Sequence, residues 1–100
     1  MANYERSTPM TAKEVFALAD EVLAERAGVK RDHESRHSVT YKGAEGTVTL
    51  ESHRHGPANM ITARTNQLRT SKLDKAVRDL MNRLPYQPED TIHKPGVQVG

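Results

Sequence analysis

Two runs of alternating apolar and polar residues, in the stretch "HSVTYKGAEGTVTLES", most constrain what this chain can fold into. Val39 and Tyr41 alternate with polar neighbours, and Val48 and Leu50 do so again after the turn segment 43–46. A period of two is typical of a strand with one buried face. Two such runs around a short glycine-containing loop predict a β-hairpin. The chain must therefore contain a sheet that is covered on at least one face.

A third strand is predicted in "ANMITARTN", after a second turn in "HGP" at 55–57. A three-stranded antiparallel meander is the simplest arrangement of these runs, since consecutive strands usually lie side by side. Side chains alternate between the two faces of a strand. We expect the core-facing residues to be Val39, Tyr41, Val48, Leu50, Ile61 and Ala63. The opposite face then carries Thr40, Lys42, Thr49, Glu51, Met60, Thr62 and Arg64, with His53 and His55 sharing its parity.

Two amphipathic helices flank these strands. Thr11 and Glu14 form a T-x-x-E capping box, and Gly28 is a typical C-terminal stop, which predicts a helix over 12–27. Ser71 and Asp74 form a similar S-x-x-D cap before a second helix that ends ahead of Pro85. The predicted apolar stripes are Val15, Phe16, Ala19, Val22 and Leu23 in the first helix, and Leu73, Ala76, Val77, Leu80, Met81 and Leu84 in the second.

The predicted fold class is therefore α+β in the order α-β-β-β-α. The three-stranded antiparallel sheet has both helices packed on one face and leaves the other face open. Residues 11–84 form a single compact domain. We expect residues 1–10 to be a flexible lead-in, the charged segment 29–37 to be a connector, and residues 85–100, which are rich in proline, to be an extended or disordered tail.

The composition indicates a small core. The chain has 100 residues, of which 35% are apolar and four are aromatic, so one marginal domain and some tendency to self-associate are expected. It contains no cysteine, which excludes disulfides and thiol chemistry. No apolar leader and no membrane-spanning run is visible, so we expect a soluble cytoplasmic protein with no membrane partner.

The histidines in "LESHRHGPAN" raise the question of a metal site. His53 and His55 stand at positions i and i+2 on the fraying end of one predicted strand, so their Cβ atoms project the same way. Zinc needs a third or fourth ligand, for which Glu51, His33 and His37 are candidates. An exposed pair without conventional ligand spacing is more often simply solvated. We therefore expect no metal, and if one binds, His53 and His55 are its ligands.

Catalytic patterns are missing from the sequence. There is no G-x-S-x-G elbow, no G-x-x-x-x-G-K-[ST] loop and no G-x-G-x-x-G run. We therefore expect a non-enzymatic protein without a cofactor.

A basic run is the clearest charged feature. The net charge is +2, but residues 36–70 carry five Lys and Arg against two Asp and Glu. The candidate phosphate contacts are Arg64, Arg69, Lys72, Lys75 and Arg78. The start of the second helix also attracts anions through its backbone N–H groups. The alternative, which we favour, is an ordinary solvated helix side with the ion pairs Asp74–Arg78 and Asp79–Arg83.

The order α-β-β-β-α resembles that of the double-stranded RNA-binding domain over residues 11–84. That resemblance implies phosphate binding at the start of the second helix. The family's motifs are replaced, since "GAEG" stands in the loop where the family has a G-P-x-H-type sequence, and "SKLDKA" stands where it has a lysine-rich helix start. We do not assign the chain to this family.

The sequence thus predicts a small interaction module. Protein interaction or self-association, with a dimer as one form, would use an edge strand or the open sheet face. The candidate residues on that face are Thr40, Thr49, Glu51, Met60 and Thr62. The alternative is a nucleic-acid binder that uses the basic run. Salt distinguishes the two, because phosphate contacts weaken steeply as salt rises.

Overall fold

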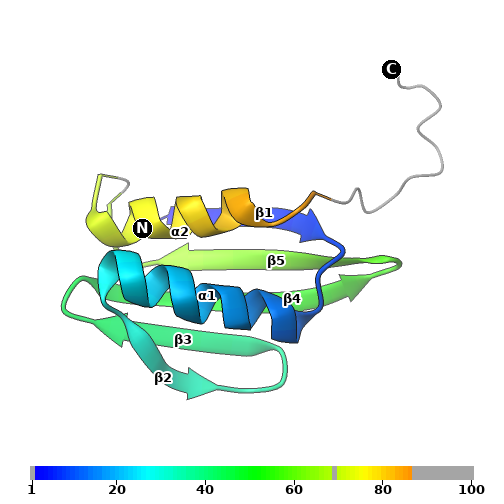
Figure 1. Cartoon of the computed structure of the whole chain (residues 1–100), viewed down its shortest axis with the longest axis horizontal. Helices are drawn as coiled ribbons and strands as arrows, with labels where there is room; N and C mark the ends of the chain where they lie inside the picture. Colours follow the sequence, from blue (N-terminus) through cyan, green and yellow to red (C-terminus); the bar gives the residue numbers. More distant parts are fainter. Residues whose placement is uncertain (1, 69, 87–100) are drawn as a thin grey trace.

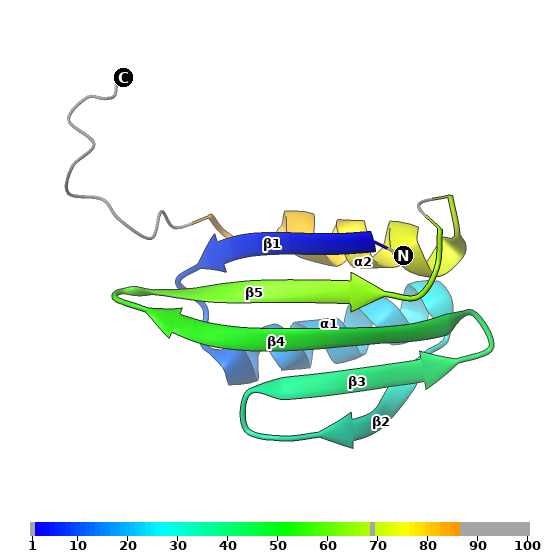
Figure 2. The same ribbon diagram turned by 180° about the vertical axis from the view of Figure 1, so that it is seen from behind.

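The computed structural model describes residues 2–68 and 70–86, which form a five-stranded sheet and two helices. The elements are β1 (Ala2–Thr8), α1 (Ala12–Ala27), β2 (Lys30–Glu34), β3 (Ser38–Gly43), β4 (Gly46–His55), β5 (Ala58–Thr65) and α2 (Lys72–Arg83). The sheet is antiparallel throughout, in the order β1-β5-β4-β3-β2. Both helices cover one face (Figure 1), and the other face is uncovered (Figure 2). The α+β class is confirmed, but the three-stranded sheet and the α-β-β-β-α order are wrong.

The central strands β3, β4 and β5 follow the predicted pattern. Val39 pairs with Leu50, and Leu50 pairs with Ala63 on its other side. All six residues predicted to face the helices are buried. Gly56, with a φ of 60°, lies in the turn between β4 and β5, where its left-handed backbone suits a residue without a Cβ. The inside–outside assignment of these three strands is confirmed.

The predicted flexible lead-in at 1–10 is wrong, because residues 2–8 are strand β1. This strand pairs with β5 along its whole length, from Ala2 opposite Thr65 to Thr8 opposite Asn59. The sequence shows no alternating apolar pattern for this strand, because its helix-facing residues Tyr4 and Arg6 carry polar atoms. Those atoms are satisfied by α2: the Tyr4 hydroxyl donates to Asp74, and Arg6 Nε donates to the Leu84 carbonyl at 2.7 Å.

The predicted connector at 29–37 is also wrong, since it contains strand β2. This strand pairs with β3, with a register shift between Arg31 and His33. All five of its residues are exposed, so it has no alternation that a sequence could reveal. Its backbone completes the second edge of the sheet.

The helices begin and end close to the predicted residues. Thr11 Oγ1 accepts from the Glu14 N–H at 3.1 Å, and Glu14 Oε1 accepts from the Thr11 N–H at 2.8 Å, so the capping box is confirmed. Gly28 ends α1 with a φ of 65°. Ser71 Oγ accepts from the Asp74 N–H at 3.0 Å and caps α2.

One hydrophobic core lies between the helices and the sheet, and it includes both predicted apolar stripes. Tyr41 is the largest of its fully buried side chains. Neither helix in the described part of the chain is long and apolar enough to cross a membrane. Of the predicted tail at 85–100, only Pro85 and Tyr86 lie within the described residues.

Candidate functional site

The open face of the sheet brings the predicted interaction residues together. Thr49 stands opposite Thr40 on one side and Arg64 on the other, while Glu51 stands opposite Thr62. Met60 lies one pair further along β5, opposite His53. Thr40, Thr49, Glu51, Met60 and Thr62 are all half-buried. Their predicted role in binding stays a prediction.

Polar side chains on this open face bond to one another. The hydroxyls of Thr40 and Thr49 are 3.1 Å apart, and Arg64 Nη2 lies 3.0 Å from Glu51 Oε2. Among the described strand residues with this parity, Met60 is the only large apolar side chain. Stable interfaces usually have an apolar centre with a polar rim. The open face therefore offers little apolar area to a large partner.

The two edges of the sheet differ in how well they are protected. Charged residues and bulges prevent a natural edge from pairing with another strand. Strand β2 has both devices, since its sequence is "KRDHE" and its register shifts between Arg31 and His33. Strand β1 is longer, and its seven pairs with β5 run without a shift. The edge of β1 is therefore the better surface for a further strand.

Two hollows flank β1. The first, of about 240 Å³, lies on the side of α2 and is lined by Tyr4, Glu5, Arg6, Arg78, Met81 and Asn82. The second, of about 220 Å³, is lined by Glu5, Arg6, Ser7, Met60 and Tyr86. Because both hollows share Glu5 and Arg6, the strand runs between them. We call β1 with these two hollows the β1 groove.

A buried carboxylate fastens α2 to β1. Asp74 is fully buried, and its oxygens accept from the Tyr4 hydroxyl at 3.1 and 2.8 Å. Arg78 Nε lies 3.1 Å from the same carboxylate. A buried charge is tolerated when it is paired and hydrogen-bonded. This contact holds Arg78 at the wall of the β1 groove.

Arg6 is held on the other side of the same hollow. Its Nε donates to the carbonyl of Leu84, the residue that caps α2, and its guanidinium lies 5.6 Å from the centre of the Tyr86 ring. Stacking on an aromatic face suits a guanidinium. The sequence does not predict Tyr4, Arg6, Met81 and Tyr86 as site residues, because they come together only around the unpredicted strand β1.

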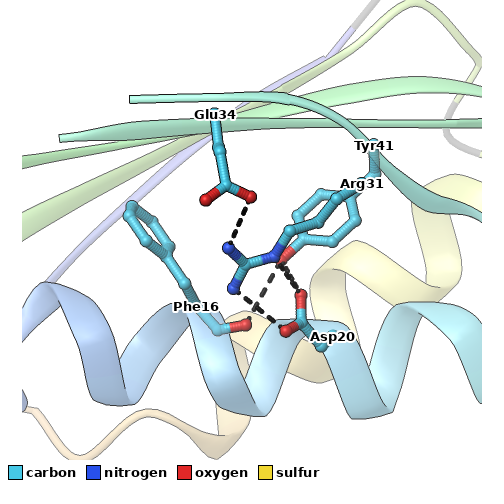
Figure 3. Close-up of polar contacts among 5 residues, drawn as sticks. All are labelled: Phe16, Asp20, Arg31, Glu34 and Tyr41. Atoms are coloured by element: carbon cyan, nitrogen blue, oxygen red, sulfur yellow. Dashed lines mark hydrogen bonds and ion pairs between the residues drawn. The ribbon is translucent and has the colours of Figure 1, made fainter. Parts of the chain in front are cut away.

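A second polar cluster joins β2 to α1 (Figure 3). Arg31 donates to Asp20 through Nε and Nη2 at 2.7 and 2.9 Å, and through Nη1 to Glu34 at 3.0 Å. The Tyr41 hydroxyl donates to Asp20 at 2.7 Å and lies 3.3 Å from the Phe16 carbonyl. A carboxylate, a guanidinium and a phenol that bind one another in this way form a structural clasp.

The pKa values in this cluster fit a structural role. Burial opposes ionisation of Asp20, but hydrogen bonds from Arg31 and Tyr41 outweigh it and hold the pKa of Asp20 below its ordinary value. Burial, together with the hydrogen bond to Asp20, raises the pKa of Tyr41 well above its ordinary value. Neither group is tuned to exchange protons near neutral pH.

The predicted basic residues are divided between the two faces. Arg64 lies on the open face, whereas Lys72, Lys75 and Arg78 belong to α2 on the other side of the sheet. Arg69 lies outside the described residues. The predicted ion pairs Asp74–Arg78 and Asp79–Arg83 are confirmed, at 3.1 and 3.0 Å. The five-stranded order also removes the topology on which the resemblance to the double-stranded RNA-binding domain was based.

The histidine pair lies at the end of a paired strand. His53 is exposed on the open face, 4.0 Å from Glu51, and β4 continues to pair with β5 as far as His55 opposite Ala58. The strand therefore extends to His55, and the predicted fraying of this end stays a prediction. The described residues contain no group of three His, Cys, Asp or Glu side chains that is placed to hold a metal ion.

Neither a scan against protein-family models nor searches of the curated proteins and of the solved structures find a match to this chain. Its function is therefore inferred from its own residues.

Proposed function

We propose that this protein is a non-enzymatic interaction module that binds an extended segment of a partner protein as an added strand against β1. The observation that carries the proposal is the contrast between the edges: β2 is short, charged and bulged, whereas β1 is regular and flanked by two hollows. In this mode of recognition, main-chain hydrogen bonds give affinity, and pockets for alternate side chains give specificity.

The position of α2 favours a single segment over a second copy of the chain. In both views α2 lies over β1, at the edge of the molecule (Figures 1 and 2). A symmetric β1–β1 pair would place the two strands about 4.8 Å apart. Packed helices need roughly 8–10 Å between their axes, so the two α2 helices would collide. A segment that brings no helix of its own avoids this collision.

The test begins with a phage library of random nine-residue peptides, selected against the full chain. The leading peptides are then synthesised with one backbone nitrogen methylated at a time. A strand donates to its neighbour through every second N–H, so we expect methylation to abolish binding at alternate positions and to be tolerated between them. A library without binders, or a loss of binding without this period of two, would contradict the proposal.

Nuclear magnetic resonance of the labelled protein locates the contact. We expect the bound peptide to shift the amide signals of residues 2–8 and to protect amides there from hydrogen exchange, while the amides of 30–34 stay unchanged. Double-stranded RNA and DNA serve as comparison ligands. The nucleic-acid alternative predicts shifts at Lys72 and Lys75 that disappear in high salt. Such shifts, in the absence of any peptide binding at β1, would favour that alternative.

A further inference from the structure

The point at which the chain leaves α2 lies beside the β1 groove. Leu84, which caps α2, is buried, and its carbonyl accepts from Arg6 Nε at 2.7 Å. Two residues later, the ring of Tyr86 lies over the Arg6 guanidinium, and Tyr86 lines the same hollow as Met60 of the open face. The chain after Tyr86 therefore starts from a fixed point next to the edge of β1.

The direction of α2 determines how that chain can meet β1. Helix α2 and strand β1 run the same way (Figures 1 and 2): Asp74 in the first turn of α2 contacts Tyr4, and Leu84 at its end contacts Arg6. The chain thus leaves α2 at the C-terminal end of β1. From there it can follow the edge only toward Ala2, which is the antiparallel direction found throughout the sheet.

The sequence that follows Tyr86, which lies outside the described residues, suits such a return. In "QPED" at 87–90, proline stands at the second position, which is the favoured one in a four-residue turn. Thr91 and Ile92 come next, and β-branched residues favour strands. Pro95 has no N–H and limits further regular pairing. The stretch 91–94 is therefore the candidate strand, and it is shorter than the seven residues of β1.

The short connection makes weak pairing sufficient. A segment that is joined to its site by a short flexible linker has an effective concentration in the millimolar range. The contact can therefore form within one chain even when the same four residues would not bind as a free peptide. It also supplies a cover for β1, since natural edges that lack a bulge are often covered by another part of the chain.

Building on the proposed function, we propose that residues 91–94 pair with β1 of their own chain as an antiparallel strand, which a partner segment must displace. The partner has the advantage of length, because it can pair along all seven residues of β1. The groove is thus closed by the chain itself and is opened by a strand that makes more main-chain hydrogen bonds.

The first test compares peptide affinities in full-length variants. In the double variant Thr91→Pro, Ile92→Pro, two consecutive prolines prevent this stretch from pairing as a strand. The peptide selected against the wild type should bind the variant about three- to tenfold more tightly, because the wild-type affinity is reduced to the fraction of molecules whose edge is free. Val97→Pro with Gln98→Pro is the matched control, since it adds two prolines beyond Pro95, and it should bind as the wild type does.

The second test locates the segment in the protein without peptide. The chain contains no cysteine, so Lys94→Cys provides one site for a nitroxide spin label. We expect the label to broaden the amide signals of residues 2–8 more strongly than those of 30–34, which form the opposite edge of the sheet. Excess peptide should remove the broadening. Mixing spin-labelled chains with isotope-labelled chains that carry no spin label shows whether the contact arises within one chain.

The outcomes separate this proposal from the proposed function. Unchanged affinity in the double-proline variant, with the alternating effect of N-methylation retained, would overturn the self-pairing and leave strand addition standing. Broadening that appears only between different chains would overturn it too, in favour of a second copy as the occupant. Broadening that excess peptide does not relieve would overturn the displacement. Absence of any peptide binder would overturn the proposed function, and the displacement with it.

Discussion

The sharpest test of the fold is the substitution Tyr4→Phe. It removes one oxygen from a residue that a flexible lead-in would leave in water. In the structure that hydroxyl donates to Asp74 at 2.8 and 3.1 Å, between the first strand and the last helix. Asp74 is fully buried, so water cannot replace the lost donor without opening the packing.

The expected loss of stability follows from the charge of the acceptor. A hydrogen bond to a charged group contributes about 1.5–3 kcal/mol, and the aromatic ring of Tyr4 is retained in the variant. Arg78 still neutralises Asp74, so the carboxylate does not become an unpaired buried charge. We therefore expect the free energy of unfolding to fall by about 2 kcal/mol.

Urea denaturation measures this change. The midpoint should move to lower urea while the slope stays the same, because the surface exposed on unfolding hardly changes. Hydrogen exchange should accelerate in residues 2–8. Tyr86→Phe is the control, since Tyr86 is 64% exposed and the loss of its hydroxyl should change stability by less than about 0.5 kcal/mol.

A destabilisation by Tyr4→Phe below about 0.5 kcal/mol, equal to that of the control, would refute this reasoning. It would mean that β1 is not fastened to α2 through Asp74. The groove proposed as the binding site would then lack the contact that holds β1 against α2. Residues 1–10 would be better described as the flexible lead-in that the sequence predicts.

Three further predictions concern the clasp, the histidine and a cap. The pKa of Asp20 is lowered by folding, so its contribution to stability is present above its unfolded value near 3.9 and is lost as pH falls through the lower folded value. Asp20→Asn should therefore reduce the loss of unfolding free energy at acid pH, measured by urea denaturation at several pH values, by less than about 1 kcal/mol because the Asp20 side chain is 46% exposed. His53→Gln should leave the melting temperature and amide spectrum almost unchanged, since His53 is exposed on the open face; unfolding would show that β4 is assigned to the wrong face. Gly28→Ala should lower the free energy of unfolding by about 1 kcal/mol in urea titrations, because φ at this cap is 65°.

The parts of the fold that the sequence predicts are those in which burial produces a periodic pattern. The helices and the strands β3, β4 and β5 each place apolar residues on one face, so Val39, Leu50 and Leu73 identify their elements. The edge strands lack this pattern. β2 is exposed along its length, and β1 meets α2 through polar atoms whose partners, Asp74 for Tyr4 and Leu84 for Arg6, lie 70 and 78 residues away in the chain. No local pattern encodes such pairings, and the candidate site depends on them.

The two edges are fastened by similar chemistry with different consequences for binding. At β2, Arg31 uses its donors on Asp20 and Glu34, so its guanidinium is bonded between the strand and α1. At β1, Tyr4 takes that anchoring role by reaching the buried Asp74. The arginine of β1, Arg6, contacts the Leu84 carbonyl and the Tyr86 ring instead. Because Tyr4 anchors β1 to α2, the outer edge of β1 remains open to a partner strand. At β2, the guanidinium of Arg31 is already used in its contacts with Asp20 and Glu34, so it cannot also bind a partner.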